Sequence, residues 1–149
     1  MNTVRAQVEI AAPLAVVFDT VLDPARLGEW VTVHRSVKWD RDAPLRAGTE
    51  MEQVLHMRGV SFKVRWTLVS ISRPRSVEWH GRGPAMSEAV IRYELSGSDE
   101  GPTTFVYENG FHTPGGILAA VAERAMLGTT AEREAHDSLQ RLKHLLESH

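Results

Sequence analysis

The sequence predicts an α+β domain in which one long C-terminal helix lies on a curved antiparallel sheet of about seven strands. Three observations lead to this prediction. Short segments of alternating apolar and polar residues recur up to residue 111, and no helical pattern separates the second strand from the last. Two short helical segments follow the first strand. A helical stripe of about 30 residues, which needs a large surface to pack on, then closes the chain.

The first strand covers residues 4–10, where every second residue is apolar, as in a strand with one face in water. Pro13 then favours a first helical turn, and residues 16–22 carry an apolar helical face. Asp23 is a good N-cap and is followed directly by proline, so a second short helix is expected to end near Trp30.

Six further segments have the strand pattern, and sequences rich in glycine and proline break the chain between several of them. The six segments cover residues 33–40, 49–57, 62–68, 77–79, 89–95 and 105–111. Antiparallel pairing is expected because no helix lies between them. Residues 96–102 are interpreted as a hairpin loop rather than a domain boundary, so residues 1–149 are expected to form one domain.

The last third of the chain has helical periodicity. Thr113 and Pro114 give a cap-plus-proline start, and Gly128 leaves open whether one helix continues or a second begins. The apolar stripe consists of Leu118, Val121, Ala122, Ala125, Ala135, Leu139, Leu142 and Leu146.

Composition excludes several classes of protein. Of the 149 residues, 42% are hydrophobic and 24% are charged, which is an ordinary composition for a folded domain. Seventeen basic and nineteen acidic residues give a net charge of −2, which argues against a dedicated nucleic-acid partner. The absence of cysteine excludes disulfides, thiol nucleophiles and cysteine-ligated metals. No apolar run reaches the length of a membrane span, and we expect a cytoplasmic protein without a signal peptide.

Several local sequences carry a resemblance to a known family. They are the opening Val8-Glu9-Ile10-Ala11-Ala12-Pro13, the segment Asp23-Pro24-Ala25-Arg26-Leu27-Gly28-Glu29-Trp30, Gly48-Thr49 at a strand start, and Trp66 followed by Arg73-Pro74. With the order of elements, they make the chain resemble the SRPBCC superfamily of START-like and birch-pollen-allergen-like domains. This superfamily includes the polyketide cyclase/dehydrase and lipid transport proteins. The segment from Glu29 to His34 is most similar to small actinobacterial members, some of which are toxins of toxin–antitoxin pairs.

The resemblance implies a helix-grip fold, in which the sheet wraps around the long helix and encloses an apolar cavity. Four tryptophans within fifty residues fit an aromatic lining, although each could equally fill the core. The residues expected to line the cavity are Trp30, Met51, Leu55, Phe62, Val64, Trp66, Trp79, Ile91, Tyr93, Tyr107, Asn109, Phe111, Leu118, Val121 and Ala122.

Polar residues on apolar faces are the candidates for orienting a ligand. Asn109 and Gln53 each share a strand face with apolar neighbours, and each would bind either a ligand or a partner within the protein. His34 follows the second helix near one end of the expected cavity. The seven histidines form no metal-binding motif, so no metal and no cofactor are expected.

Three functions remain open from the sequence. The first is binding of a small hydrophobic, aromatic or polycyclic ligand, such as a polyketide or lipid, by a monomer or weak homodimer. The second is a polyketide aromatase/cyclase or dehydratase, for which Tyr93, Tyr107, Asn109 and His34 are the candidate residues. The third is a toxin or other interaction partner of a two-protein pair. Fold alone does not choose among these.

Overall fold

A computed structural model describes residues 2–57, 59–114 and 116–148, and the side chains of residues 2 and 116–129 lie outside the description. The elements in chain order are β1 (Asn2–Ile10), α1 (Leu14–Leu22), η1 (Pro24–Arg26), α2 (Leu27–Trp30), β2 (His34–Trp39), β3 (Glu50–Met57), β4 (Val60–Ser72), β5 (Ser76–Arg82), η2 (Pro84–Met86), β6 (Glu88–Gly97), β7 (Thr103–His112) and α3 (Gly116–Glu147).

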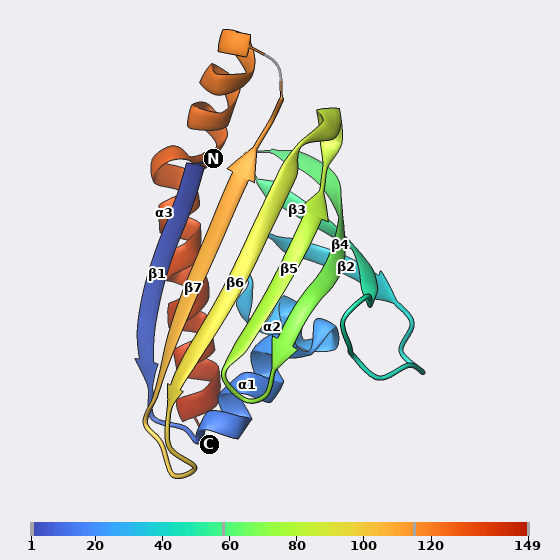
Figure 1. The fold of residues 1–149 in the computed structure, drawn as a ribbon. Helices are drawn as coiled ribbons and strands as arrows, with labels where there is room; N and C mark the ends of the chain where they lie inside the picture. The colour runs from blue at the N-terminus through green and yellow to red at the C-terminus, as the bar shows by residue number, and fades with distance from the viewer. Residues whose placement is uncertain (1, 58, 115, 149) are drawn as a thin grey trace.

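The strands of the described residues form one seven-stranded antiparallel sheet in the order β1-β7-β6-β5-β4-β3-β2 (Figure 1). Strands β2 to β7 each pair with their neighbours in the chain, whereas β1 pairs with β7. This arrangement confirms the predicted α+β class, with the short helices α1, η1 and α2 after the first strand and one long helix after the last.

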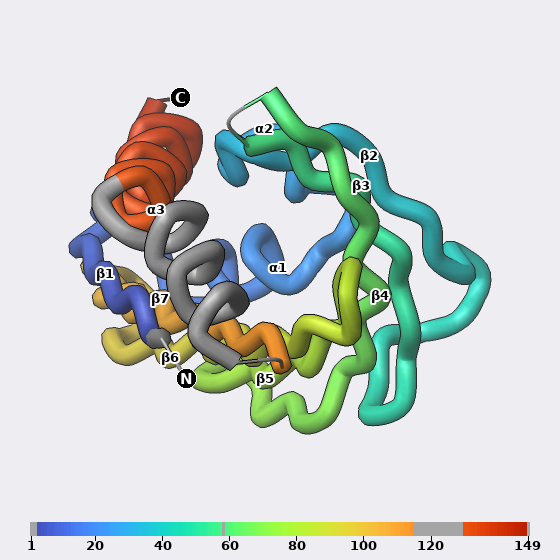
Figure 2. Tube along the Cα trace, turned by 90° about the horizontal axis from the view of Figure 1, so that it is seen from above, coloured from blue at the N-terminus to red at the C-terminus, as the bar shows by residue number. Residues whose placement is uncertain are grey.

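The sheet is curved, and the helices lie on its concave side. Figure 2 shows the strands bending round from β1 and β7 to β2, with α1, α2 and α3 inside the curve. One cause is a bulge at which the pairing of β4 with β5 shifts between Leu68 and Ser70. The bulge also explains why β4 is longer than the predicted 62–68, because Ile71 returns to the core side after it.

Alternation along the strands gives the concave face an apolar surface. Val4, Ala6, Val8 and Ile10 of β1 are all buried, and their polar neighbours point outward. The C-terminal half of α3 packs along β1, as Figure 1 shows, and buries its leucine stripe there. At the end of this helix, Lys143 Nζ donates to the Glu9 carbonyl oxygen at 2.8 Å.

Candidate ligand-binding site

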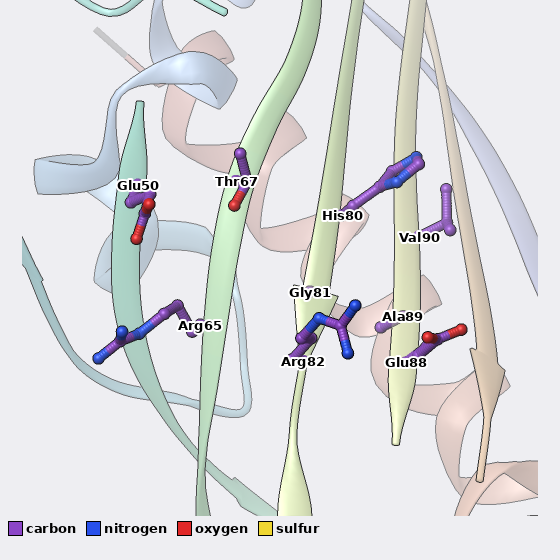
Figure 3. A pocket seen from close by; sticks show the side chains of 9 residues that line it. All are labelled: Glu50, Arg65, Thr67, His80, Gly81, Arg82, Glu88, Ala89 and Val90. Atoms are coloured by element: carbon purple, nitrogen blue, oxygen red, sulfur yellow. The ribbon is translucent and has the colours of Figure 1, made fainter. Parts of the chain in front are cut away.

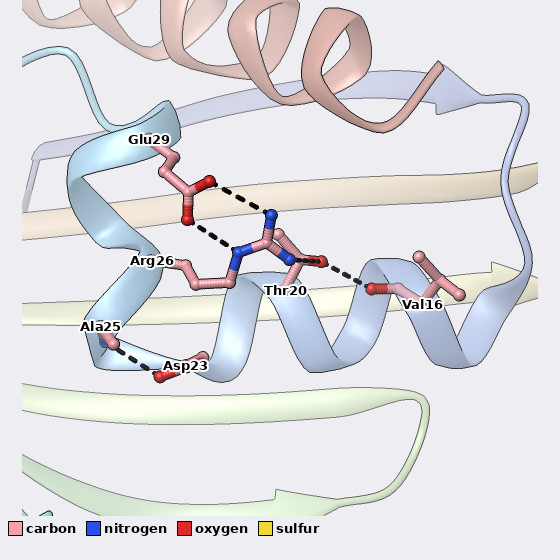
Figure 4. A network of polar contacts seen from close by, with 6 residues as sticks. All are labelled: Val16, Thr20, Asp23, Ala25, Arg26 and Glu29. Atoms are coloured by element: carbon pink, nitrogen blue, oxygen red, sulfur yellow. Dashed lines mark hydrogen bonds and ion pairs between the residues drawn. The ribbon is translucent and has the colours of Figure 1, made fainter. Parts of the chain in front are cut away.

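Trp30 stands at the end of α2, and a polar network fixes the turn that carries it (Figure 4). Arg26 Nε donates to Glu29 Oε2 at 2.8 Å, and Arg26 Nη1 donates to Thr20 Oγ1 at 3.1 Å. The Thr20 hydroxyl in turn donates to the Val16 carbonyl oxygen at 2.8 Å. These bonds tie η1 and α2 to α1 and fix the turn that leads to Trp30.

The Trp30 ring is fully buried in an aromatic cluster. Its centroid lies 6.0 Å from those of Tyr93 and Phe105, and both contacts are edge-to-face. Tyr107 extends the cluster, at 6.0 Å from Tyr93. The indole Nε1–H of Trp30, however, has no hydrogen-bond partner among the described residues. A buried donor without a partner is costly, so this N–H needs an acceptor that the described protein does not supply.

A small hollow of about 80 Å³ has Trp30 among the residues of its wall. It is bounded by β1, β7, the segment after α2, the end of β3 and the described half of α3. The residues around it are Val4, Trp30, Val31, Val33, Met57, Tyr107, Asn109, Ala131, Glu134, Ala135 and Ser138. We call it the inner hollow.

Asn109 adds a second unused polar atom to the inner hollow. Its Nδ2 donates to the Tyr107 hydroxyl oxygen at 3.2 Å, while its Oδ1 is buried without a partner among the described residues. If the amide were turned over, Oδ1 would accept from Tyr107 and the amide nitrogen would be left over instead. One amide atom therefore stays without a partner in either orientation.

A second, more apolar hollow of about 280 Å³ lies between the ends of β4 and β7 and the η2 turn. We call it the outer hollow. The residues around it are Val60, Phe62, Val64, Gly83, Pro84, Ala85, Ser87, Glu88, Ala89, Phe111 and Thr113. Ser87 Oγ, which is also buried without a partner among the described residues, belongs to this set.

The two hollows are neighbours along β7. Asn109 lines the inner hollow, and Phe111, two residues further on the same strand face, lines the outer one. Positions two apart on a strand are separated by about 7 Å.

A polar cluster on α3 forms one wall of the inner hollow. The Thr32 hydroxyl donates to Glu134 Oε2, and the Thr32 backbone N–H donates to Ser138 Oγ at 3.1 Å. Glu134 and Ser138 are four residues apart, so they share one helix face. They lie next to Ala135, a residue of the predicted apolar stripe, but neither polar residue was predicted to line a cavity.

The predicted lining residues lie in three places, which are the inner hollow, the outer hollow and the core. Trp30, Tyr107 and Asn109 surround the inner hollow, and Phe62, Val64 and Phe111 surround the outer one. The others on the concave side belong to the buried core or pack against it, and they are Met51, Leu55, Trp66, Trp79, Ile91 and Tyr93. The predictions for Leu118, Val121 and Ala122 fall outside the described side chains.

Burial keeps both tyrosine hydroxyls protonated. It raises the pKa of Tyr107 to about 12, with an opposing effect from the Asn109 hydrogen bond, and raises the pKa of Tyr93 further. At neutral pH the Tyr107 hydroxyl can therefore act as a hydrogen-bond donor to a ligand, but it is not a base.

A third hollow, of about 400 Å³, lies on the opposite, convex face of the sheet (Figure 3). Its wall includes Glu50, Arg65, Arg82 and Glu88, which carry charges of both signs. Glu50 lies on the exposed face of β3. Among the described residues, no group of three or more histidine, aspartate or glutamate side chains could hold a metal ion.

A buried chain of hydrogen bonds connects His34 to the core. The Trp66 indole N–H donates to Gln53 Oε1 at 2.9 Å, and this bond orients the amide. Gln53 Nε2 then donates to His34 Nδ1, also at 2.9 Å, so His34 must be neutral with its proton on Nε2. Gln53 and His34 are thus used within the protein and do not face either hollow.

This chain predicts a loss of stability in mild acid. Burial lowers the pKa of His34, so the unfolded chain takes up a proton more readily than the folded one. The free energy of unfolding should therefore fall as the pH drops below the ordinary histidine value of about 6.5, by less than about 1.4 kcal/mol. Urea unfolding at pH 7.5 and 5.5 measures the effect. His34→Gln should flatten the profile, whereas His136→Gln, at an exposed site on α3, should not. Parallel profiles for the wild type and His34→Gln would contradict the account.

The family model described as polyketide cyclase / dehydrase and lipid transport matches residues 1–147. The chain belongs to this family. The match covers nearly the whole sequence, and it confirms the SRPBCC resemblance that the strand order and local motifs suggested.

Solved structures support the same fold for this member of the polyketide cyclase / dehydrase and lipid transport family. The Zhui aromatase/cyclase from Streptomyces sp. R1128 superposes with a TM-score of 0.77 at 17% identity, covering 98% of this chain and 93% of that one. A START superfamily protein from Mycobacterium smegmatis gives a TM-score of 0.75 at 11% identity, covering 97% of both chains. These likenesses confirm the predicted helix-grip fold.

A curated relative of this family member matches over part of its length. Toxin Rv0910 of Mycobacterium tuberculosis is 23% identical over 83 residues, which are 56% of this chain and 58% of that protein. The match thus spans little more than half of the relative. In the described part of the chain, no helix has the length and apolar character needed to cross a membrane.

Proposed function

We propose that the protein binds a small, largely apolar molecule on the concave side of its sheet, with the polar end of that molecule in the inner hollow. The observation that carries this proposal is the location of the unused polar atoms. Trp30 Nε1, Asn109 Oδ1 and Ser87 Oγ are the buried side-chain atoms without partners among the described residues, and each belongs to a residue that lines one of the two hollows.

The energetics favour a ligand of mixed character. The walls of the outer hollow are mainly apolar, and burying an apolar surface contributes about 25 cal/mol per Å². The Trp30 N–H and the Asn109 amide would add little net affinity for a bare hydrocarbon, because both would stay unpaired. A polar group placed against them would satisfy both and fix the orientation of the molecule.

The state of the three titratable residues that the sequence named as catalytic candidates favours binding over catalysis. A general acid or base works best when its pKa lies near the working pH. The pKa values of Tyr93 and Tyr107 are raised well above neutrality, and His34 is engaged by Gln53. The similarity to an aromatase/cyclase therefore supports a shared type of cavity, and turnover of the ligand remains the second candidate function.

The third hypothesis, a toxin of a two-protein pair, has one supporting observation. It is the partial match to a protein named as a toxin. The hollows suggest no protein partner, so this hypothesis stays a prediction.

The test of the proposed function compares 2-naphthol with naphthalene, which has the same rings and no hydroxyl. We expect 2-naphthol to bind with a stoichiometry of one, seen by native mass spectrometry and isothermal titration calorimetry. Trp30→Phe keeps an aromatic ring but removes the N–H. It should weaken 2-naphthol binding by about 3–10-fold, as expected for one hydrogen bond, and leave naphthalene unaffected.

Trp39→Phe is the matched control, because Trp39 lies in β2 and takes a cation–π contact from Arg41 at 4.4 Å. It should leave both affinities unchanged. Failure of both compounds to show saturable binding to the wild type would contradict the proposed function.

A further inference from the structure

The inner hollow has a carboxylate in its wall that the proposed binding function does not yet use. Glu134 lines the hollow together with Trp30 and Asn109. The Thr32 hydroxyl donates to Glu134 Oε2, which holds the side chain in place. An ionised carboxylate can accept about four hydrogen bonds, so Glu134 keeps acceptor capacity for a ligand.

Glu134 takes part in no ion pair within the part of the chain whose side chains the structure describes. The side chain is half-buried, and its surroundings include apolar groups such as Val4, Ala131 and Ala135. A negative charge in such a setting acts strongly on any second charge that enters the hollow.

The inner hollow is also small. At about 80 Å³ it admits one small group, and the residues around it include both Trp30, a hydrogen-bond donor, and Glu134, an acceptor. A hydroxyl both accepts and donates, so it satisfies both at once. A ketone oxygen has no proton for Glu134, and an ammonium has no lone pair for Trp30. A carboxylate would face the Glu134 charge directly.

We propose that the inner hollow selects ligands whose buried end is a neutral hydroxyl and rejects those whose buried end is a carboxylate. Glu134 is then the residue that sets this specificity, so phenols and alcohols bind and free carboxylic acids are excluded. The inference rests on the proposed binding function and narrows it to one class of ligand.

The experiment compares 2-naphthol with 2-naphthoate, which share a ring system, at pH 7 by isothermal titration calorimetry on the full chain. We expect the wild type to bind 2-naphthol at least about tenfold more tightly. Glu134→Gln removes the charge and keeps an acceptor for Thr32. It should reduce the ratio of the two dissociation constants below about threefold, mainly by tightening the binding of 2-naphthoate. Glu132→Gln, at an exposed site on the same helix, should leave the ratio unchanged.

Equal affinities for the two compounds in the wild type would overturn the inference while leaving the proposed function standing. An unchanged ratio in folded Glu134→Gln would also overturn it. Absence of binding by both compounds would overturn the proposed function and this inference with it. The wild-type comparison needs no variant, so it tests the selectivity even if Glu134→Gln does not fold.

Discussion

Replacing Trp30 by alanine is expected to lower the free energy of unfolding by about 3–5 kcal/mol. The Trp30 side chain is only 1% exposed and packs edge-on against Tyr93 and Phe105. Its removal would leave a cavity between α2 and the sheet, and the network that holds α2 gives this region little freedom to collapse. Urea denaturation with a two-state fit measures the change.

Trp39→Ala provides the matched comparison. Trp39 is half-buried in β2, and Arg41 covers its ring from the solvent side. We expect Trp39→Ala to lower the free energy of unfolding by less than half as much as Trp30→Ala does. Equal losses at the two positions would show that α2 does not contribute to the core as described.

The second large effect is expected from filling the outer hollow. The Ala89 side chain faces this hollow, and its register partner on β7 is Phe111. A phenylalanine at position 89 would place its ring in the space proposed for the body of the ligand. We expect Ala89→Phe to weaken 2-naphthol binding by more than about tenfold, because the apolar contacts of the ligand would be lost.

Val90→Phe is the control for this change. Val90 is the next residue on β6 and lines the hollow on the convex face instead. It should leave 2-naphthol affinity unchanged, and both variants should keep a cooperative unfolding transition. Undiminished binding by Ala89→Phe would place the ligand outside the outer hollow.

The fold could be predicted because its strands alternate regularly. Residues such as Phe105, Tyr107 and Phe111 can share the concave face only if β7 is a strand, and the apolar stripe of α3 needs that face to pack on. The bulge in β4 was missed because Leu68, Val69 and Ile71 give no local sign of which residue leaves the pairing.

The site could be predicted only in part. The alternation of apolar and polar residues shows that Trp66 and Tyr107 both face inward. It cannot show that the Trp66 indole N–H donates a hydrogen bond to Gln53 while the Trp30 indole N–H has no partner among the described residues. That difference arises from the three-dimensional packing of α2 against β7 and α3. Glu134 was missed for a related reason, since a charged residue on a helix usually indicates the solvent side.

The most direct test of the central claim is the indole region of a ¹H–¹⁵N NMR spectrum recorded during a titration with 2-naphthol. Trp30→Phe and Trp66→Phe assign the two signals that matter. We expect the Trp30 indole N–H signal to shift downfield as its missing hydrogen bond forms. The Trp66 signal should hardly move, because its N–H already donates to Gln53. A Trp30 signal that stays in place while the ligand saturates the protein would contradict the account.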